Sequence, residues 1–418
     1  MPVVESHQVS GERYRVAVRV GSRAAAGATV VAGVLTLLAA LAPPVAARPA
    51  QHGATVLVST ARNGTQGNGS SAVGPHAPGI SWDGRYVAFA SLASNLAPTS
   101  STRRSRVYRK DLKTGKVLQI DVTDAGKDPT TGSTDLVAMT PDARYVLFEA
   151  RGDGMSPPGT QFDPDQFPYP SWWIRDTVAA RTLRAPDHAA ALSLDASRVL
   201  TIDNLSTAVV DRATGHSWSL PGTAVAMSAN GQSVLVNTDA PLSPSDTDGA
   251  FDLYVHDLDT GVDAWVADSP PCLLGASLNA NGTVAAFVAS GLSGQPSTAS
   301  VWRAATGTVE SLPQVQQDLA GVALDGAGDR VGFYGIDYPT GGGLLANVYV
   351  TEVATGLTTL VSRAPDGSAL HAPPGLYPVA GYVSLSADGH YAAYLSTGDN
   401  LTTSADVNDA ADAFRARL

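Results

Sequence analysis

Two short acidic segments of the sequence have the residue types and spacing of a cation site. Oxygen-bearing side chains with the same spacing are Asp246, Asp248 and Asp252 in "SPSDTDGAFD" and Asp406, Asn408 and Asp412 in "SADVNDAAD". Hard oxygen ligands at alternate positions of a tight turn suit calcium, so these six residues are the predicted metal ligands and calcium the predicted cofactor. The alternative interpretation is two solvated hairpin turns, because Asp and Asn also favour turns.

A second candidate site is the segment "DGMSPPGTQFDPDQFPYPSWW" at residues 153–173. Its predicted ligand-binding residues are four aromatic side chains, Phe162, Phe167, Tyr169 and Trp172. This density is high for a chain with 6% aromatic residues, and aromatic side chains anchor protein interfaces and sugars. The alternative is that these rings pack down onto the fold.

The sequence contains no recognisable catalytic motif. It has neither a His-Glu-x-x-His motif nor a phosphate-binding loop. "SGLSGQ" at residues 290–295 has Gln295 where a nucleophile elbow needs its second Gly. The eight His residues are scattered, and no pair has the spacing of metal ligands. We therefore predict no catalytic residue.

The elements that must position the candidate residues repeat along the chain. "SWDGRYVAF" at residues 81–89 has a late counterpart, "SADGHYAAY" at residues 386–394. The residues at the Gly position of this motif are Gly84, Ala143, Ala196, Gly231, Gly282, Gly328 and Gly389. Asp or Asn followed by Gly predicts a hairpin turn, and the alternating apolar residues that follow predict a strand.

A second signature follows each turn. "LYVHDLDTG" at residues 253–261 matches "VYVTEVATG" at residues 348–356, an aromatic strand that runs into a Thr-Gly turn and a fourth strand. One aligned column holds the aromatic residues Tyr108, Trp173, Tyr254, Tyr349 and Phe414. Four antiparallel strands in about 50 residues form one propeller blade. The fold class is therefore all-β, a seven-bladed β-propeller of four-stranded antiparallel blades.

The two ends of the chain complete the ring in this interpretation. The last unit ends at "DAFRARL" with only three strands, and "ATVLVSTARNGTQ" at residues 54–66 resembles the fourth strand of the unit before it. We expect residues 54–60 to pair with the strand that contains Phe414 and Arg415. The N-terminal strand then closes the last blade and leaves no open end in the ring.

The stretch "SWDGRYVAFASLASNL" at residues 81–96, together with the later Asp-x-x-Thr-Gly turns, resembles the TolB-type, WD-like β-propeller repeat proteins. It is most similar to the secreted actinobacterial versions. The resemblance covers roughly residues 54–418 and implies the propeller fold. TolB has a separate N-terminal domain for which this chain has no room, so a role in the Tol-Pal system is not carried over.

The N-terminus has the pattern of a secretory signal peptide. Four Arg residues between positions 13 and 23 precede an apolar run at residues 24–41, and Val45 and Ala47 supply the small residues of a cleavage site. We expect residues 1–47 to be a signal peptide, 48–53 a short linker and 54–418 a single propeller domain. The protein is then secreted or otherwise extracytoplasmic, without stable membrane insertion after cleavage. The alternative is a retained N-terminal membrane anchor.

The net charge and the cysteine content limit the classes of partner and the covalent links that the protein can have. The formal net charge of −11 argues against nucleic acid, which selects a basic surface. Cys272 is the single cysteine, so no intrachain disulfide forms, and we expect it to be buried as a small apolar residue. The predicted function is a non-catalytic binding scaffold, expected to be monomeric, whose blade loops hold a protein or carbohydrate ligand. The alternative is a secreted hydrolase or lyase with a site in the central channel.

Overall fold

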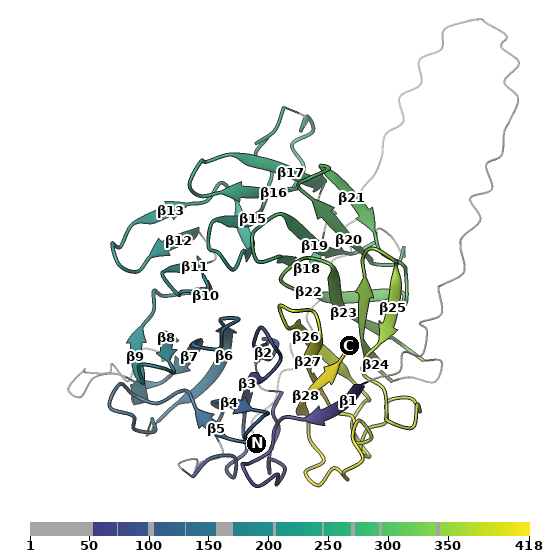
Figure 1. Cartoon of the computed structure of the whole chain (residues 1–418). Coiled ribbons are helices and arrows are strands. Elements are labelled where there is room, and N and C mark those ends of the chain that lie inside the picture. The colour runs from purple at the N-terminus through teal and green to yellow at the C-terminus, as the bar shows by residue number, and fades with distance from the viewer. Residues whose placement is uncertain are drawn as a thin grey trace, which may run out of the picture. The chain divides into compact units, whose positions relative to one another are not determined.

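The computed structural model describes residues 53–418 except 73, 99–103, 130, 156–169, 204–205, 245, 269–271, 292–294 and 340–342. Its strands form seven four-stranded antiparallel sheets arranged around a centre (Figure 1). The seven-bladed propeller expected from the repeated turns is therefore confirmed. No helix in the described part of the chain is long and apolar enough to cross a membrane.

Each blade has an inner, a second, a third and an outer strand. The inner strands are β2 (Gly79–Ile80), β6 (Ser133–Met139), β10 (Ala189–Leu192), β14 (Thr223–Met227), β18 (Leu273–Leu278), β22 (Asp318–Leu324) and β26 (Ala380–Leu385). The second strands are β3 (Tyr86–Ser91), β7 (Tyr145–Arg151), β11 (Arg198–Ile202), β15 (Ser233–Thr238), β19 (Val284–Ala289), β23 (Arg330–Asp337) and β27 (Tyr391–Ser396). A short 3-10 helix, η1 (Asp153–Met155), follows β7.

The third strands are β4 (Arg106–Asp111), β8 (Ser171–Asp176), β12 (Thr207–Asp211), β16 (Asp252–Asp257), β20 (Thr298–Arg303), β24 (Leu345–Glu352) and β28 (Asp412–Arg417). The outer strands are β5 (Val117–Gln119), β9 (Arg181–Arg184), β13 (Ser217–Ser219), β17 (Asp263–Asp268), β21 (Thr308–Ser311), β25 (Leu357–Leu360) and, for the seventh blade, β1 (Gly53–Leu57).

The N-terminal strand closes the ring as predicted. β1 pairs antiparallel with β28, with Val56 opposite Arg415 and Leu57 opposite Phe414. Figure 1 shows β1, from the start of the chain, beside β28, from its end. The seventh sheet therefore combines the first strand and the last three strands of the described chain.

The repeated motif forms the tight turn between the inner and second strands of each blade. Ser81 Oγ donates to Asp83 Oδ1 at 2.8 Å, and Ser386 Oγ donates to Asp388 Oδ1 at 2.6 Å in the same way. The seven aligned residues have φ between 54° and 82°. At Gly84 a Cβ would collide with the ring of Tyr391 in the neighbouring blade, so glycine is required there for both dihedral and space.

Two of these turns carry alanine at positive φ, which leaves room for stabilisation. Ala143 has φ 58° and Ala196 has φ 54°. An Ala residue in this backbone region costs the folded state about 1–2 kcal/mol. Gly avoids that cost but loses more conformational entropy on folding, which offsets part of the gain. We therefore expect Ala143→Gly and Ala196→Gly each to raise the free energy of unfolding by about 0.5–1 kcal/mol. Urea unfolding measures the change. Ala213→Gly, in a turn with ordinary φ, should instead lower stability, and a loss at both test positions would contradict the explanation.

The hydrophobic core is divided among the blade interfaces. Seven buried clusters are present, one between each pair of neighbouring blades in the described structure. Phe89 and Tyr108 of the first blade, for example, pack with Leu395 of the seventh. The predicted aromatic column is confirmed by register, since Tyr108, Trp173, Tyr349 and Phe414 each lie opposite an aromatic residue of the second strand.

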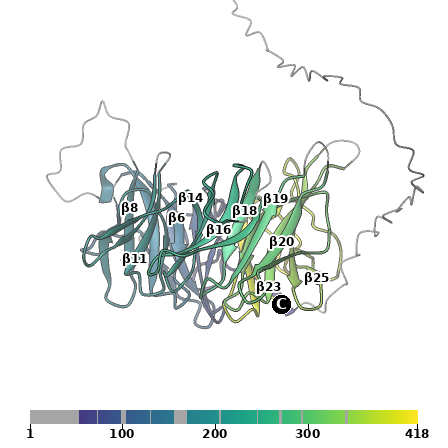
Figure 2. The same ribbon diagram turned by 90° about the horizontal axis from the view of Figure 1, so that it is seen from above.

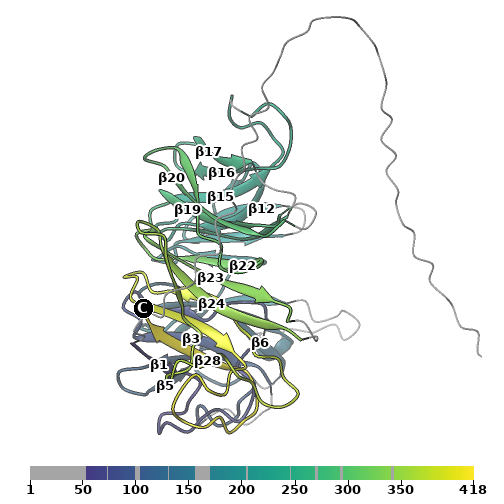
Figure 3. The same ribbon diagram turned by 90° about the vertical axis from the view of Figure 1, so that its right-hand side faces the viewer.

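The antiparallel course of the strands gives the ring two different faces, seen edge-on in Figures 2 and 3. The turn face carries the tight turns from inner to second strands and from third to outer strands. There, backbone bonds such as Trp82 N to Pro141 O and Asp388 N to Trp82 O link neighbouring blades. The loop face carries the connections from second to third strands and from each outer strand to the next blade. Both predicted acidic segments belong to the loop face.

Candidate functional site

The aromatic segment is largely beyond the described structure. Phe162, Phe167 and Tyr169 lie outside the described residues, so their predicted ligand contacts stay predictions. Trp172 is described and is 7% exposed. Its ring lies 4.9 Å from that of His188 and packs between the second and third blades. Trp173 occupies the aromatic column, and Trp172 lies on the opposite side of the same strand. The sequence pattern did not show that this opposite side is also buried, against the third blade.

The second acidic segment contacts the N-terminal part of the chain. Gln66 Nε2 donates to Asp406 Oδ1 at 2.7 Å and to Asp412 Oδ2 at 2.6 Å. Ser59 Oγ donates to the other oxygen of Asp412 at 2.5 Å, and the N–H of Val407 donates to Gln66 Oε1 at 3.0 Å. We call Ser59, Gln66, Asp406 and Asp412 the closure network. It ties the strand that closes the ring to the last blade.

Within the closure network, burial and hydrogen bonding have opposite effects on the pKa of Asp412. Burial raises the pKa of Asp412 to about 6, and the hydrogen bonds from Ser59 and Gln66 oppose that increase. Asn408 Nδ2 donates to Gly67 O at 2.8 Å and to Asp412 Oδ1 at 3.5 Å, so Asn408 faces Asp412 with its amide nitrogen. Calcium binding at Asp406, Asn408 and Asp412 stays a prediction, and in the structure the protein's own donors occupy these oxygens.

Gln66→Ala should destabilise the protein measurably. The substitution removes the two hydrogen bonds that the Gln66 amide donates and leaves the carboxylates of Asp406 and Asp412 each without one donor. We therefore expect the free energy of unfolding to fall by about 1–3 kcal/mol. Urea unfolding measures the loss. Gln232→Ala, which removes an exposed glutamine from a turn, is the control and should cost less than about 0.5 kcal/mol. Equal small effects of both variants would show that the network contributes nothing to closure.

The first acidic segment brings its three predicted ligands together. Asp246, Asp248 and Asp252 offer one oxygen each, and these oxygens lie within 4.8 Å of one another. Tyr254 donates its hydroxyl to Asp246 Oδ2 at 2.7 Å. Burial and the neighbouring Asp246 raise the pKa of Tyr254, so this hydroxyl stays protonated and keeps donating. In the part of the chain that the structure describes, this is the one group of three such side chains at metal-ligand distance.

The histidines do not converge in the described structure. His256, His371 and His390 each lie beside a different carboxylate, those of Asp263, Asp399 and Asp388. The first pair lies in the fourth blade, the second on the loop face of the seventh blade, and the third in the tight turn of that same blade. Cys272 is exposed, so the expectation that it is buried was wrong. It precedes β18 in the connection between two blades.

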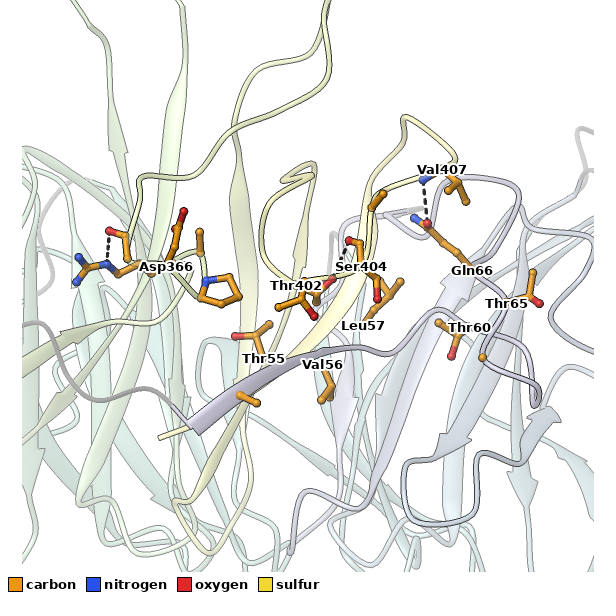
Figure 4. A pocket seen from close by; sticks show the side chains of 18 residues that line it. Thr55, Val56, Leu57, Thr60, Thr65, Gln66, Asp366, Thr402, Ser404 and Val407 are labelled. Carbon is orange, nitrogen blue, oxygen red and sulfur yellow. Dashed lines mark hydrogen bonds between the residues drawn. The ribbon is translucent and has the colours of Figure 1, made fainter.

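A groove of about 1190 Å³ lies at the outer ends of the sixth and seventh blades. We call it the rim groove. Its lining comes from β1 and the segment after it, from residues 363–367 behind β25, and from residues 402–407 of the last loop. Figure 4 shows β1 running along the groove, with Thr55, Thr60 and Thr65 on one side and Thr402 and Ser404 on the other. Sequence reasoning missed this groove because three segments distant in sequence form it.

The rim groove is rich in hydroxyl groups and nearly neutral. Its charged lining residues are Arg363 and Asp366, and Arg363 Nε donates to Gly367 O at 2.7 Å. None of the 18 lining residues is aromatic. Such a surface offers hydrogen bonds along an extended ligand rather than a platform for stacking.

A separate feature lies in the wall of the central channel. Tyr382 on the inner strand β26 is 42% exposed and has φ 54°, at a bulge in its pairing with β27. Its ring lies 6.1 Å from that of Tyr334. A bulky residue in this backbone region is strained, and such strain is often associated with a functional site.

Comparisons with known proteins support the fold. No protein-family model matches the chain, and no curated protein matches it significantly. An oligogalacturonate lyase in complex with manganese superposes with a TM-score of 0.51 at 14% identity, covering 89% of this chain and 95% of the lyase. A chain of a mitotic checkpoint complex gives a TM-score of 0.50 at 12% identity, with coverages of 94% and 99%. TolB from Acinetobacter baumannii gives 0.38 at 14% identity, with coverages of 75% and 76%.

At these identities the similarities show the fold alone. The solved structures include an enzyme and a member of a protein assembly on the same architecture, so the fold does not choose between catalysis and binding. The propeller that the TolB resemblance implied is confirmed by the seven four-stranded sheets.

Proposed function

We propose that the protein is a non-catalytic, extracytoplasmic binding scaffold that holds an extended segment of a partner protein in the rim groove. The observation that carries this proposal is the position of the groove along β1, which is the edge strand of its sheet. An edge strand presents unpaired backbone donors and acceptors to a second chain, and peptides bind such edges by adding a strand.

The pairing of β1 indicates which groups face the ligand. The N–H of Val58 donates to Ala413 O at 2.8 Å, so Val58 is directed toward β28. Because hydrogen-bonded and non-hydrogen-bonded pairs alternate in an antiparallel ladder, the backbone N–H and C=O of Leu57 point away from β28, toward the open edge. Leu57 also lines the groove. Its backbone is therefore the expected first contact of an added strand.

The size and lining of the groove favour polypeptide over the other ligand class, carbohydrate. A volume of about 1190 Å³ exceeds that of typical small-molecule pockets, about 300–1,000 Å³. Sugars are usually held against aromatic rings, which this lining does not contain. A second candidate, a hydrolase or lyase site in the central channel, is favoured only by the strained Tyr382.

Selection from a random peptide library displayed on phage tests the proposal. Peptides selected on the wild-type protein should bind Thr65→Arg and Thr403→Arg at least about tenfold more weakly, because both exposed residues line the groove. Thr359→Arg is the matched control, since Thr359 lies on β25, the outer edge of the sixth blade, outside the groove lining. Peptides that bind all three variants like the wild type would contradict the proposed site.

Export is part of the same proposal. The Arg-rich start, the apolar run and the small residues before Arg48 support cleavage after Ala47. N-terminal sequencing of the mature protein should then begin at Arg48. A mature protein that still begins near Met1 would instead support the membrane-anchored alternative.

A further inference from the structure

One corner of the blade recurs around the ring and is polar in every blade. It is the position on the third strand two residues before the aromatic column. The residues at this position are Arg106, Ser171, Thr207, Asp252, Thr298, Asn347 and Asp412. We call this position, with the residues that face it from the outer strand and the preceding loop, the blade corner.

Three blade corners are compensated by the protein's own groups. In the first blade Arg106 lies 3.6 Å from Asp121 and 3.3 Å from Asp128. In the sixth, Ser362 Oγ donates to Asn347 Oδ1 at 2.9 Å. In the seventh, the closure network supplies donors to Asp412. A guanidinium, a hydroxyl and an amide thus each satisfy oxygen atoms at equivalent places.

The fourth blade corner has carboxylates where the others have donors. Asp252 is 1% exposed and lies opposite Asp268 in the ladder, at the position that corresponds to Ser59 and Ser362. Asp246 and Asp248 bring two further carboxylates from the loop, within 4.8 Å of Asp252. Four carboxylates therefore belong to this corner, whereas the first corner has two beside Arg106 and the seventh has two bridged by the amide of Gln66.

The environment of Asp246 is a second, independent observation that favours a bound cation at this corner. The residue is only 8% exposed, and Tyr254 satisfies its Oδ2. Its Oδ1 is buried and accepts no hydrogen bond from the residues that the structure describes. A buried carboxylate oxygen without a donor is costly, and a cation shared with Asp248 and Asp252 would remove that cost.

We propose that the fourth blade corner binds one calcium ion through Asp246, Asp248 and Asp252. Calcium–oxygen distances are about 2.3–2.6 Å, so ligand oxygens on opposite sides of the ion are about 4.6–5.2 Å apart. The observed limit of 4.8 Å fits inside that sphere. Magnesium, at about 2.0–2.1 Å, would require the oxygens to lie closer together. Water or backbone oxygens complete the six to eight ligands that calcium takes.

The seventh blade corner does not bind calcium in this account, although its sequence has the same spacing. The side-chain amide of Gln66 bridges Asp406 and Asp412 there, at the place that a cation would share. The proposal is thus one ion per chain, independent of the rim groove and of its ligand.

Titration of the metal-free protein with calcium, followed by isothermal calorimetry and native mass spectrometry, tests the proposal. We expect one calcium per chain with a Kd on the order of 10⁻⁴ to 10⁻³ M, the range of extracellular sites. Asp248→Asn changes an exposed ligand and should weaken binding about tenfold or more. Asp246→Asn should abolish it. Asp406→Asn, the matched acid of the seventh blade, should bind calcium like the wild type.

The variants separate the outcomes. Circular dichroism in chelator confirms that each variant is folded, and the exposed Asp248→Asn keeps the test valid if Asp246→Asn does not fold. No calcium binding up to about 10 mM, roughly tenfold above the weakest expected Kd, would overturn the proposal. So would unchanged binding in Asp248→Asn, or loss of binding in Asp406→Asn.

Discussion

A chain that begins at Ala61 should not form a stable ring. It lacks β1, so Ala413 and Arg415 lose backbone partners and Asp412 loses the hydroxyl of Ser59. The fully buried Val58 is also lost from the interface with the first blade. Burial of one such side chain contributes about 1.5–3 kcal/mol and each hydrogen bond about 1 kcal/mol, so the total loss is about 5 kcal/mol or more. Total stabilities are about 5–15 kcal/mol, and we expect partial unfolding or aggregation at 37 °C.

The control for this experiment is a chain that begins at Arg48, which keeps β1 and should melt cooperatively. Adding a synthetic peptide of residues 53–60 to the shorter chain should restore part of the lost stability, because the open edge of β28 is then paired again. Thermal unfolding measures both effects. Equal melting temperatures for the two chains would show that ring closure by β1 contributes little.

Arg106→Met should be among the most destabilising single substitutions outside the turns. Arg106 is 1% exposed, and Asp121, 3.6 Å from its Nε, is fully buried. Its guanidinium also donates to the backbone oxygens of Ser105, Gly132 and Pro129. Removing one member of a buried ion pair costs about 3–5 kcal/mol, because the other charge stays buried alone.

The double variant Arg106→Met/Asp121→Leu distinguishes charge from packing. If the lone carboxylate is the cause, the double variant should recover most of the loss, since apolar replacements of buried pairs are often neutral. Urea unfolding at pH 7 gives the comparison. A double variant as unstable as Arg106→Met would mean that the contacts of the Arg106 side chain with the backbone dominate.

The cost of Arg106→Met should also depend on pH. Burial raises the pKa of Asp121 to about 6 even beside Arg106, well above the value of about 3.9 in an unfolded chain. The folded state therefore binds a proton that the unfolded state does not between about pH 4 and 6. Stability from this proton is fully present below about pH 4 and is lost as the pH rises through 6. The substitution should thus cost less at pH 4.5 than at pH 7.

Local chemistry explains how much of the fold could be predicted. The turn at Gly84 and its six counterparts needs positive φ, which Gly, Asn and Asp tolerate, so the period was visible without alignment. The column that contains Tyr254 and Tyr349 was visible because the aromatic residue stands at a fixed distance before the Gly of the Thr-Gly turn. The missing last strand and the surplus first strand then indicated the closure between residues 54–60 and Phe414.

The candidate sites were only partly predictable, because their partners come from distant segments. Gln66 reaches Asp406 across 340 residues, and no local pattern marks it as a donor. The rim groove likewise arises where β1, residues 363–367 and residues 402–407 meet. The equal spacing of Asp246 and Asp406 made two corners look alike, although only the second has an amide from elsewhere in the chain.

Amide hydrogen exchange with and without a peptide selected on the wild-type protein tests the binding function most directly. The account predicts slower exchange at Leu57 and in residues 402–407 when the peptide binds, because an added strand pairs the open edge of β1 and covers the groove. The strands of the channel wall, β22 and β26, should be unchanged. Slower exchange around Tyr382 on β26, with none at Leu57, would contradict the account and place the ligand in the central channel.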